Sequence, residues 1–110
     1  MFGSSNVTIR VVDMDRSIKF YTEILGLGLK NRYGSEWAEI EGPGITIALH
    51  PATGKNYVSN PNISIGFGVK NIHEVTKILE KKGVKFQLKD DGFVLLAFFM
   101  DPDGAQLYLA

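Results

Sequence analysis

The chain has 110 residues, enough for one compact domain or for two very small units that share a core. Hydrophobic residues make up 45% and charged residues 22%, which is the balance of a globular protein rather than a disordered one. The 12 basic and 12 acidic residues cancel, so nothing suggests a nucleic-acid or anionic-membrane partner. The absence of cysteine excludes disulfides and thiolate chemistry.

The N-terminal residues, MFGSS, carry neither the basic nor the apolar region of a signal peptide. No apolar run approaches the roughly 20 residues of a membrane-spanning helix. We therefore expect a soluble, cytoplasmic protein that binds neither membrane nor nucleic acid. Residues 1–5 are expected to be a frayed tail.

Hydropathy alternates over residues 6–12, which predicts a strand with one face on a core. An apolar stripe then predicts a helix that Asp13 caps at its start and Gly26 ends in a left-handed conformation. The apolar strand face is Val7, Ile9 and Val11, the opposite face is Asn6, Thr8, Arg10 and Val12, and the helical stripe is Met14, Ile18, Tyr21 and Leu25.

Three further strands are predicted over residues 27–32, 36–41 and 45–50, with a Gly42-Pro43-Gly44 turn before the third. In the strand 36–41, Trp37 and Glu39 alternate with the apolar residues Ala38 and Ile40. In the strand 45–50, His50 lies on the face opposite Leu49. Residues 51–62, PATGKNYVSNPN, lack apolar periodicity and predict a linker.

The second half repeats this plan. A strand is predicted over residues 63–69, and a helix follows that Asn71 and Glu74 open as a capping box and Gly83 ends. Its stripe is Ile72, Val75, Ile78 and Leu79. Strands follow at 85–88, 93–100 and 105–109, the last after the turn sequence Asp101-Pro102-Asp103-Gly104.

Corresponding residues of the two halves lie 58 to 60 positions apart, as in Val11 and Val69 or Gly44 and Gly104. The chain therefore predicts an α+β fold of two βαβββ modules, residues 6–50 and 63–110, joined by the linker 51–62 in one compact domain. Each helix covers one face of its four strands. We expect the uncovered faces to curl toward each other and enclose a cleft, giving an incompletely closed, eight-stranded barrel-like sheet with the helices outside.

The runs DMDRSIKFYTEILGL and DPDGAQLYL, with the second helix after Val69 between them, resemble the vicinal oxygen chelate superfamily. This group includes glyoxalase I, extradiol dioxygenases and bleomycin-resistance proteins. The resemblance covers residues 6–110. It implies the same fold and a homodimer, because short chains of this superfamily commonly pair, and the linker would permit exchange of modules between chains.

The resemblance also implies four metal-ligand positions, which carry over to Asn6, Ala48, Ser64 and Tyr108, in agreement with the repeat offsets. Divalent transition metals need imidazole, carboxylate or thiolate ligands, usually three or more from the protein. Alanine offers no donor atom, asparagine and serine offer neutral oxygens, and tyrosine offers only a phenol. We therefore predict no metal site and no other cofactor.

Strand parity places a set of mostly polar side chains on the cleft faces, either as a small-molecule site or as a surface for water or a dimer partner. Arg10 suits a carboxylate or phosphate, as the matching position in glyoxalase I implies, or an ion pair with Glu39 or Glu41. His50 is an acid–base group or a structural histidine before Pro51. The face is expected to carry Asn6, Thr8, Arg10, Trp37, Glu39, Thr46, Ala48, His50, Ser64, Gln106 and Tyr108.

Trp37 either stacks on a planar ligand or packs against other side chains of the protein. Tyr108 either donates a hydrogen bond to a ligand oxygen or fills the space that a metal would occupy. The predicted ligand-binding residues are Asn6, Thr8, Arg10, Trp37, Glu39, His50, Ser64 and Tyr108.

Three functions are compatible with these residues, and they leave open whether the chain is an enzyme. The first hypothesis is a metal-free protein that sequesters a polar or anionic, partly aromatic small molecule, like a bleomycin-resistance protein. The second is a metal-independent, glyoxalase-like lyase or isomerase that uses cleft residues as acid and base. The third is a protein-interaction or regulatory module with a degenerate site.

Overall fold

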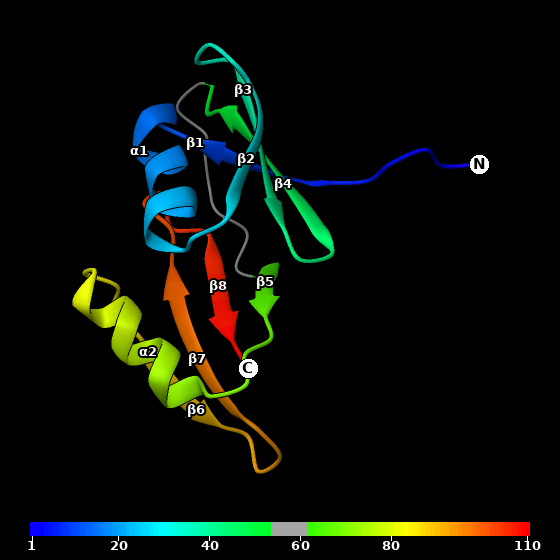
Figure 1. The fold of residues 1–110 in the computed structure, drawn as a ribbon. Coiled ribbons are helices and arrows are strands. Elements are labelled where there is room, and N and C mark those ends of the chain that lie inside the picture. Colours follow the sequence, from blue (N-terminus) through cyan, green and yellow to red (C-terminus); the bar gives the residue numbers. More distant parts are fainter. Residues whose placement is uncertain (54–61) are drawn as a thin grey trace. The chain divides into compact units, whose positions relative to one another are not determined.

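The computed structural model describes residues 1–53 and 62–110, and the chain divides into two compact units, Met1–Val58 and Ser59–Ala110 (Figure 1). Each unit contains one four-stranded mixed sheet and one helical segment, and we describe each by itself. Residues 54–61 of the predicted linker lie outside the described part. None of the helices in the described ranges has the length and apolar character that crossing a bilayer requires.

The sheet of unit 1 has the strand order β1-β4-β3-β2. Strands β1 and β4 pair in parallel, and the other two pairings are antiparallel. The βαβββ connection explains this arrangement. The helical crossover carries the chain from β1 to β2 at the far edge of the sheet, and the two hairpins then bring β4 back beside β1 in the parallel direction. The strands are β1 (Val7–Val11), β2 (Gly28–Tyr33), β3 (Trp37–Gly42) and β4 (Ile45–Pro51).

The helical segment of unit 1 is part α-helix and part π-helix, whereas the sequence predicted one uniform helix. Helix α1 (Met14–Lys19) begins at Asp13, whose side chain accepts a hydrogen bond from the Arg16 amide at 3.1 Å. The chain then widens into the π-helix η1 (Phe20–Ile24), in which the Leu25 amide donates to the Phe20 carbonyl five residues back, at 3.0 Å. Gly26 ends the segment with φ +74°, as predicted.

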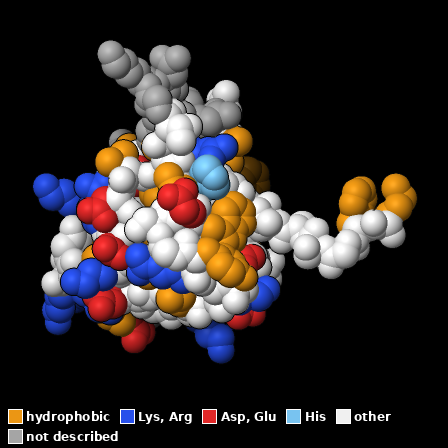
Figure 2. All heavy atoms as spheres, turned by 90° about the horizontal axis from the view of Figure 1, so that it is seen from above, with side chains coloured by type: hydrophobic (Ala, Val, Ile, Leu, Met, Phe, Trp, Pro, Cys, Tyr) orange, Lys and Arg blue, Asp and Glu red, His pale blue; other side chains and the backbone are white. Residues whose placement is uncertain are grey.

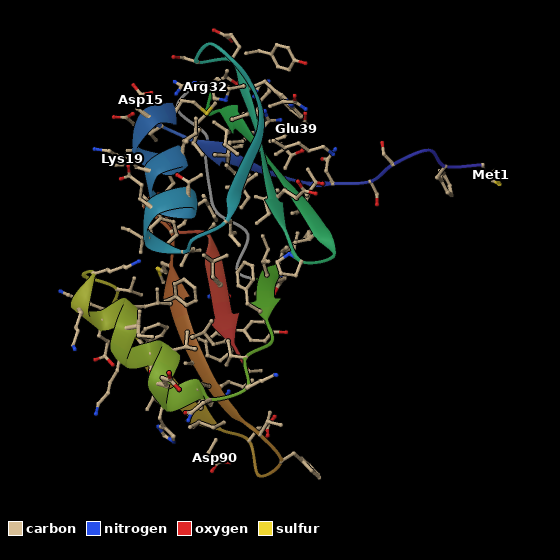
Figure 3. All side chains as sticks on the ribbon, viewed as in Figure 1. Met1, Asp15, Lys19, Arg32, Glu39 and Asp90 are labelled. Atoms are coloured by element: carbon tan, nitrogen blue, oxygen red, sulfur yellow. The ribbon has the colours of Figure 1, made fainter. Side chains whose placement is uncertain are left out.

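Helix α1 packs on β3 and β4, and this side of the sheet forms the core of unit 1. Ile40, Ile47 and Leu49 are completely buried there. Asp15 of α1 also pairs with Arg32 of β2 at 2.6 Å, which ties the helix to the β2–β3 hairpin (Figure 3). We call the other side of this sheet, away from α1, the open face of unit 1.

Unit 2 repeats the plan with the strand order β5-β8-β7-β6, in which only β5 and β8 are parallel. Helix α2 (Ile72–Lys81) begins at Asn71, whose side chain accepts from the Glu74 amide at 3.1 Å, and it packs against β7. We call the side of this sheet away from α2 the open face of unit 2. The strands are β5 (Ser64–Phe67), β6 (Gln87–Asp90), β7 (Leu95–Met100) and β8 (Gln106–Leu109).

Several details of unit 2 differ from the prediction, and β5 and β8 are shorter than the predicted strands 63–69 and 105–109. Ile78, expected in the helical stripe, is 49% exposed, and Thr76 is buried in its place. Strand β6 starts later than predicted because Gly83, with φ +96°, reverses the chain and the Val84 amide then bonds back to Leu79. Strand β7 also starts later, because residues 91–94 form the β6–β7 turn.

The strand registers confirm the internal repeat. Thr8 lies opposite Ala48 in unit 1, and Gly66 lies opposite Tyr108 in unit 2. Residues 8 and 66 differ by 58 positions, and residues 48 and 108 differ by 60, which are the offsets found in the sequence. The predicted α+β fold of two βαβββ modules is therefore confirmed. Among the described residues the strands form two four-stranded sheets and no closed barrel.

Candidate functional site

The open face of unit 1 carries most of the predicted site residues, because strands β1, β4 and β3 are neighbours and share one register. Thr8 and Glu39 both lie opposite Ala48, on either side of β4. Arg10 lies opposite His50, two residues further along β4, and Thr46 lies opposite Glu41 toward the other end of β4. The open face of unit 1 is therefore a patch of mostly polar side chains around the buried Ala48.

Arg10 and His50 are in contact through the guanidinium and the ring nitrogen Nδ1. The same Nδ1 lies 3.0 Å from the carbonyl oxygen of Pro51. Arginine only donates and a carbonyl only accepts, so one tautomer cannot satisfy both. With its proton on Nε2, His50 accepts from Arg10, whereas with its proton on Nδ1 it donates to Pro51.

Trp37 completes this group. Its ring centroid lies 6.0 Å from that of His50, with an angle of 77° between the ring planes, which is an edge-to-face contact. Arg10 is exposed, and the two rings are half-buried. We call Arg10, Trp37 and His50 the Arg10 cluster. It places a cation, an imidazole and an indole within reach of one small molecule.

Glu39 and Asn6 lie on the same side of the sheet but outside the cluster. Glu39 is half-buried, points away from α1 (Figure 3), and accepts a hydrogen bond from Asn31 Nδ2 at 2.9 Å. The Thr8 hydroxyl donates to Asn6 Oδ1 at 3.1 Å, and both residues are exposed. Figure 2 shows acidic and basic side chains interspersed on the face that it draws.

A groove of about 500 Å³ lies at the end of the unit 1 sheet where β1 begins. The sequence missed this feature: residues 1–5 read as a frayed tail and Gly42-Pro43-Gly44 as a turn, and only the parallel pairing of β1 with β4 brings them together. Its lining is Ser5, Asn6, Val7, Glu41, Gly42, Gly44, Ile45 and Thr46.

Two predicted site residues, Ser64 and Tyr108, belong to unit 2. Ser64 is exposed and lies opposite Gln106. Tyr108 is half-buried, and its ring centroid lies 5.6 Å from that of Phe98 on the neighbouring strand β7. Phe98 is not among the predicted site residues, although its alternation with buried Ala97 and Phe99 was the available signal.

The four positions carried over from metal-binding relatives do not fit a divalent metal. In the described ranges, no group of three or more histidine, aspartate or glutamate side chains is placed to hold one. Ala48 contributes a buried methyl group, and Asn6 already accepts a hydrogen bond from Thr8. The open face of unit 1 carries the imidazole of His50 and the carboxylates of Glu39 and Glu41, but these described side chains are not grouped as the ligand set that such ions require.

Comparisons with known proteins agree with the fold. The Glyoxalase/Bleomycin resistance protein/Dioxygenase superfamily matches residues 3–109. The chain is 30% identical to a lactoylglutathione lyase of Schizosaccharomyces pombe over 90% of its own length, but it spans only 44% of that protein. It is 29% identical to a probable lactoylglutathione lyase of Synechocystis, covering 92% of this chain and 88% of that one.

Among solved structures, the integron cassette protein HFX_CASS4 from the Halifax Harbour sewage outfall metagenome has a TM-score of 0.78 and 26% identity. The match covers 99% of this chain and 97% of that chain. The match to the superfamily over almost every residue, together with the two βαβββ units, settles the family. The chain belongs to the glyoxalase/bleomycin resistance protein/dioxygenase superfamily.

Proposed function

We propose that this protein binds a small anionic, partly aromatic molecule at the Arg10 cluster, without a metal ion. The observation that carries this proposal is the contact of Arg10 with His50 and of His50 with Trp37 on a sheet face that α1 does not cover. A guanidinium offers several N–H donors in a plane and suits carboxylate and phosphate oxygens.

His50 supports anion binding in one of its two tautomers. When Nδ1 accepts from Arg10, the ring proton resides on Nε2, and this N–H is a second donor. The contact with Arg10 also restricts the guanidinium, which lowers the entropy lost when a ligand binds. Trp37 adds an apolar wall for the ligand's ring.

Polar side chains along β1 extend this site toward the groove. Arg10 follows Asn6 by four residue steps of extended chain, a span of about 13 Å. Thr8 lies between them, and the groove begins at Asn6. A ligand longer than one ring would find hydroxyl and amide partners along β1, which supports a polar as well as an aromatic part.

The chemistry of the donor groups supports metal-independent binding. The four carried-over positions supply a methyl group, an amide, a hydroxyl and a phenol, and these do not form a ligand set for a divalent transition metal. Binding therefore depends on the protein's own cation, Arg10.

Metal-independent lyase or isomerase activity is the second candidate function, because two curated relatives at 29–30% identity are named lactoylglutathione lyase and probable lactoylglutathione lyase. His50 and Glu39 would supply the acid–base groups. Lactoylglutathione lyase activity of metal-depleted protein that disappears in His50→Ala would favour this candidate over simple binding.

The test of the proposed function is a thermal-shift screen of aromatic and aliphatic carboxylates and phosphates, followed by calorimetry on the hits. Arg10→Gln should weaken binding about tenfold or more, because a hydrogen bond to a charged group is lost. Arg16→Gln, on α1, is the matched control and should change affinity less than about twofold. A blank screen, or equal loss in both variants, would contradict the proposal.

Native mass spectrometry of purified protein would test the remaining expectations together. We expect a homodimer that carries no metal and, in some preparations, a co-purified small molecule. Partner proteins captured while every ligand screen stays blank would instead favour the interaction module. A cytoplasmic location remains a prediction.

A further inference from the structure

Gly66 and Tyr108 form an unusual cross-strand pair on the open face of unit 2. They lie directly opposite each other in the parallel β5–β8 pairing. A Cβ atom built on Gly66 would lie 2.2 Å from Cζ, 2.4 Å from Oη and 2.6 Å from Cε2 of Tyr108. A side chain at position 66 would therefore occupy the space of the tyrosine ring.

These three distances also give the orientation of the ring. Oη and Cε2 lie only slightly further from the Cβ position than Cζ, although each is bonded to Cζ. This requires the line from that position to Cζ to run nearly perpendicular to the ring plane. The Tyr108 ring thus turns one face to the position that a side chain at Gly66 would take, and its other face is directed away from that position.

Apolar side chains of β7 lie beside the Tyr108 ring. The Phe98 ring, opposite Tyr108 on β7, is tilted by 44° to it with the centroids 5.6 Å apart. Met100, on the same face of β7, is 61% exposed. Tyr108 and Phe98 are both half-buried, so part of each ring is accessible. We call Gly66, Phe98 and Tyr108 the aromatic shelf.

We propose that the aromatic shelf is a binding site for a planar aromatic ring, which stacks on the face of Tyr108 that is directed away from Gly66. A ring that packs closely beside a glycine loses little entropy when a second ring stacks on it, and stacking on a flat ring face selects planar over puckered molecules. Polarisable Met100 suits the edge of such a ring. Ser64 and Gln106, paired on the same face, offer polar groups beside it.

The corresponding positions of unit 1 show what is particular to unit 2. The repeat places Thr8 where unit 2 has Gly66, and Ala48 where it has Tyr108. Unit 1 therefore has no equivalent ring. This inference goes beyond the proposed function, because the shelf would bind an aromatic ring whether or not Arg10 binds an anion.

The test uses two probes with one carbon skeleton and one hydroxyl group, planar 2-naphthol and puckered decahydro-2-naphthol. Amide shifts in ¹H–¹⁵N spectra report affinity and location. We expect 2-naphthol to shift the amides of β5 and β8, and to bind about tenfold more tightly than the saturated probe. Equal binding of both probes, or shifts confined to unit 1, would overturn the proposal.

Matched glycine variants connect binding to the ring position. Gly66→Ala should displace the Tyr108 ring and weaken 2-naphthol about tenfold. Gly68→Ala, two residues along the chain with nothing within 4 Å of its Cβ position, should leave affinity within about twofold. Equal effects of the two substitutions would contradict the role of the shelf.

Tyr108 variants decide the matter if Gly66→Ala does not fold. Tyr108→Phe should keep 2-naphthol binding within about twofold, and Tyr108→Leu should weaken it about tenfold. Retained binding in Tyr108→Leu would show that the tyrosine has only a packing role. Arg10→Gln separates the two proposals, since it should reduce anion binding and leave 2-naphthol binding unchanged.

Discussion

Arg10 and His50 are direct partners across the parallel β1–β4 pair, and the guanidinium contacts Nδ1 of the imidazole. The Pro51 carbonyl, 3.0 Å from the same nitrogen, competes for it. The position of one proton on His50 therefore decides whether Nδ1 accepts a hydrogen bond from Arg10 and orients it, or donates one to the Pro51 carbonyl. His50 is thus a positioning residue for the proposed anion site as well as a donor in it.

Substituting His50 should separate these roles. Asparagine can place an acceptor near the position of Nδ1, whereas phenylalanine keeps only the ring beside Trp37. We expect His50→Phe to weaken anion binding about tenfold and His50→Asn to weaken it by less, measured by calorimetry with a hit from the carboxylate and phosphate screen. The opposite order would mean that the ring contact with Trp37 matters more than the hydrogen bond.

Metal removal should leave this protein unchanged. The donor chemistry at Asn6, Ala48, Ser64 and Tyr108 predicts much less than one divalent ion per chain by elemental analysis. Dialysis against a chelator should leave both the melting temperature and anion affinity as they were, because no folding energy depends on a metal. Stoichiometric metal, or a lowered melting temperature after chelation, would contradict this reading of the four positions.

Asp91 should make the β6–β7 turn sensitive to acid. Its carboxylate accepts hydrogen bonds from the Val94 amide at 3.0 Å and the Phe93 amide at 2.9 Å, and these bonds lower the pKa of Asp91. Because the pKa is lowered in the folded state, the stabilisation is complete above the pKa of an unfolded aspartate and is lost as the pH falls through the lowered value. The Phe93 and Val94 amide shifts should titrate together in that acidic range.

Asp91→Asn provides the comparison for this turn, since it keeps an oxygen acceptor and removes the charge. The acid transition of the two amides should then disappear. Asp90→Asn is the control: Asp90 accepts only from the Gly92 amide among the turn contacts described, so the transition at Phe93 and Val94 should persist. Its loss in the control would assign the effect to general charge rather than to Asp91.

The ion pair between Asp15 and Arg32 should contribute little to stability despite its length of 2.6 Å. The Asp15 side chain is 78% exposed and the Arg32 side chain 34%, so water screens their attraction. A double-mutant cycle with Asp15→Asn and Arg32→Gln, followed by urea unfolding, should give a coupling energy below about 1 kcal/mol. Arg32→Gln alone should have the larger single effect, since Arg32 also donates to the Gly34 carbonyl at 2.8 Å.

Much of the fold could be predicted because its signals are local. Alternation within β1 identifies a strand and its two faces without knowledge of its partner. Asp13 and Asn71 mark helix starts through bonds to amides three residues away. The π-helical turn after Lys19 was not predictable, because an apolar stripe does not distinguish hydrogen bonds four residues apart from bonds five apart.

The same distinction between local and distant signals applies to the residues of the candidate sites. By itself, the sequence determined that Arg10, His50 and Tyr108 lie on the faces that the helices leave uncovered, because side-chain direction in a strand depends only on odd or even position. Only the tertiary structure decided that Arg10 touches His50, 40 residues away, and that the Tyr108 ring occupies the space that a side chain at Gly66 would need. Such contacts depend on the register between distant strands and on the space that a missing side chain leaves, and neither is encoded in a local pattern.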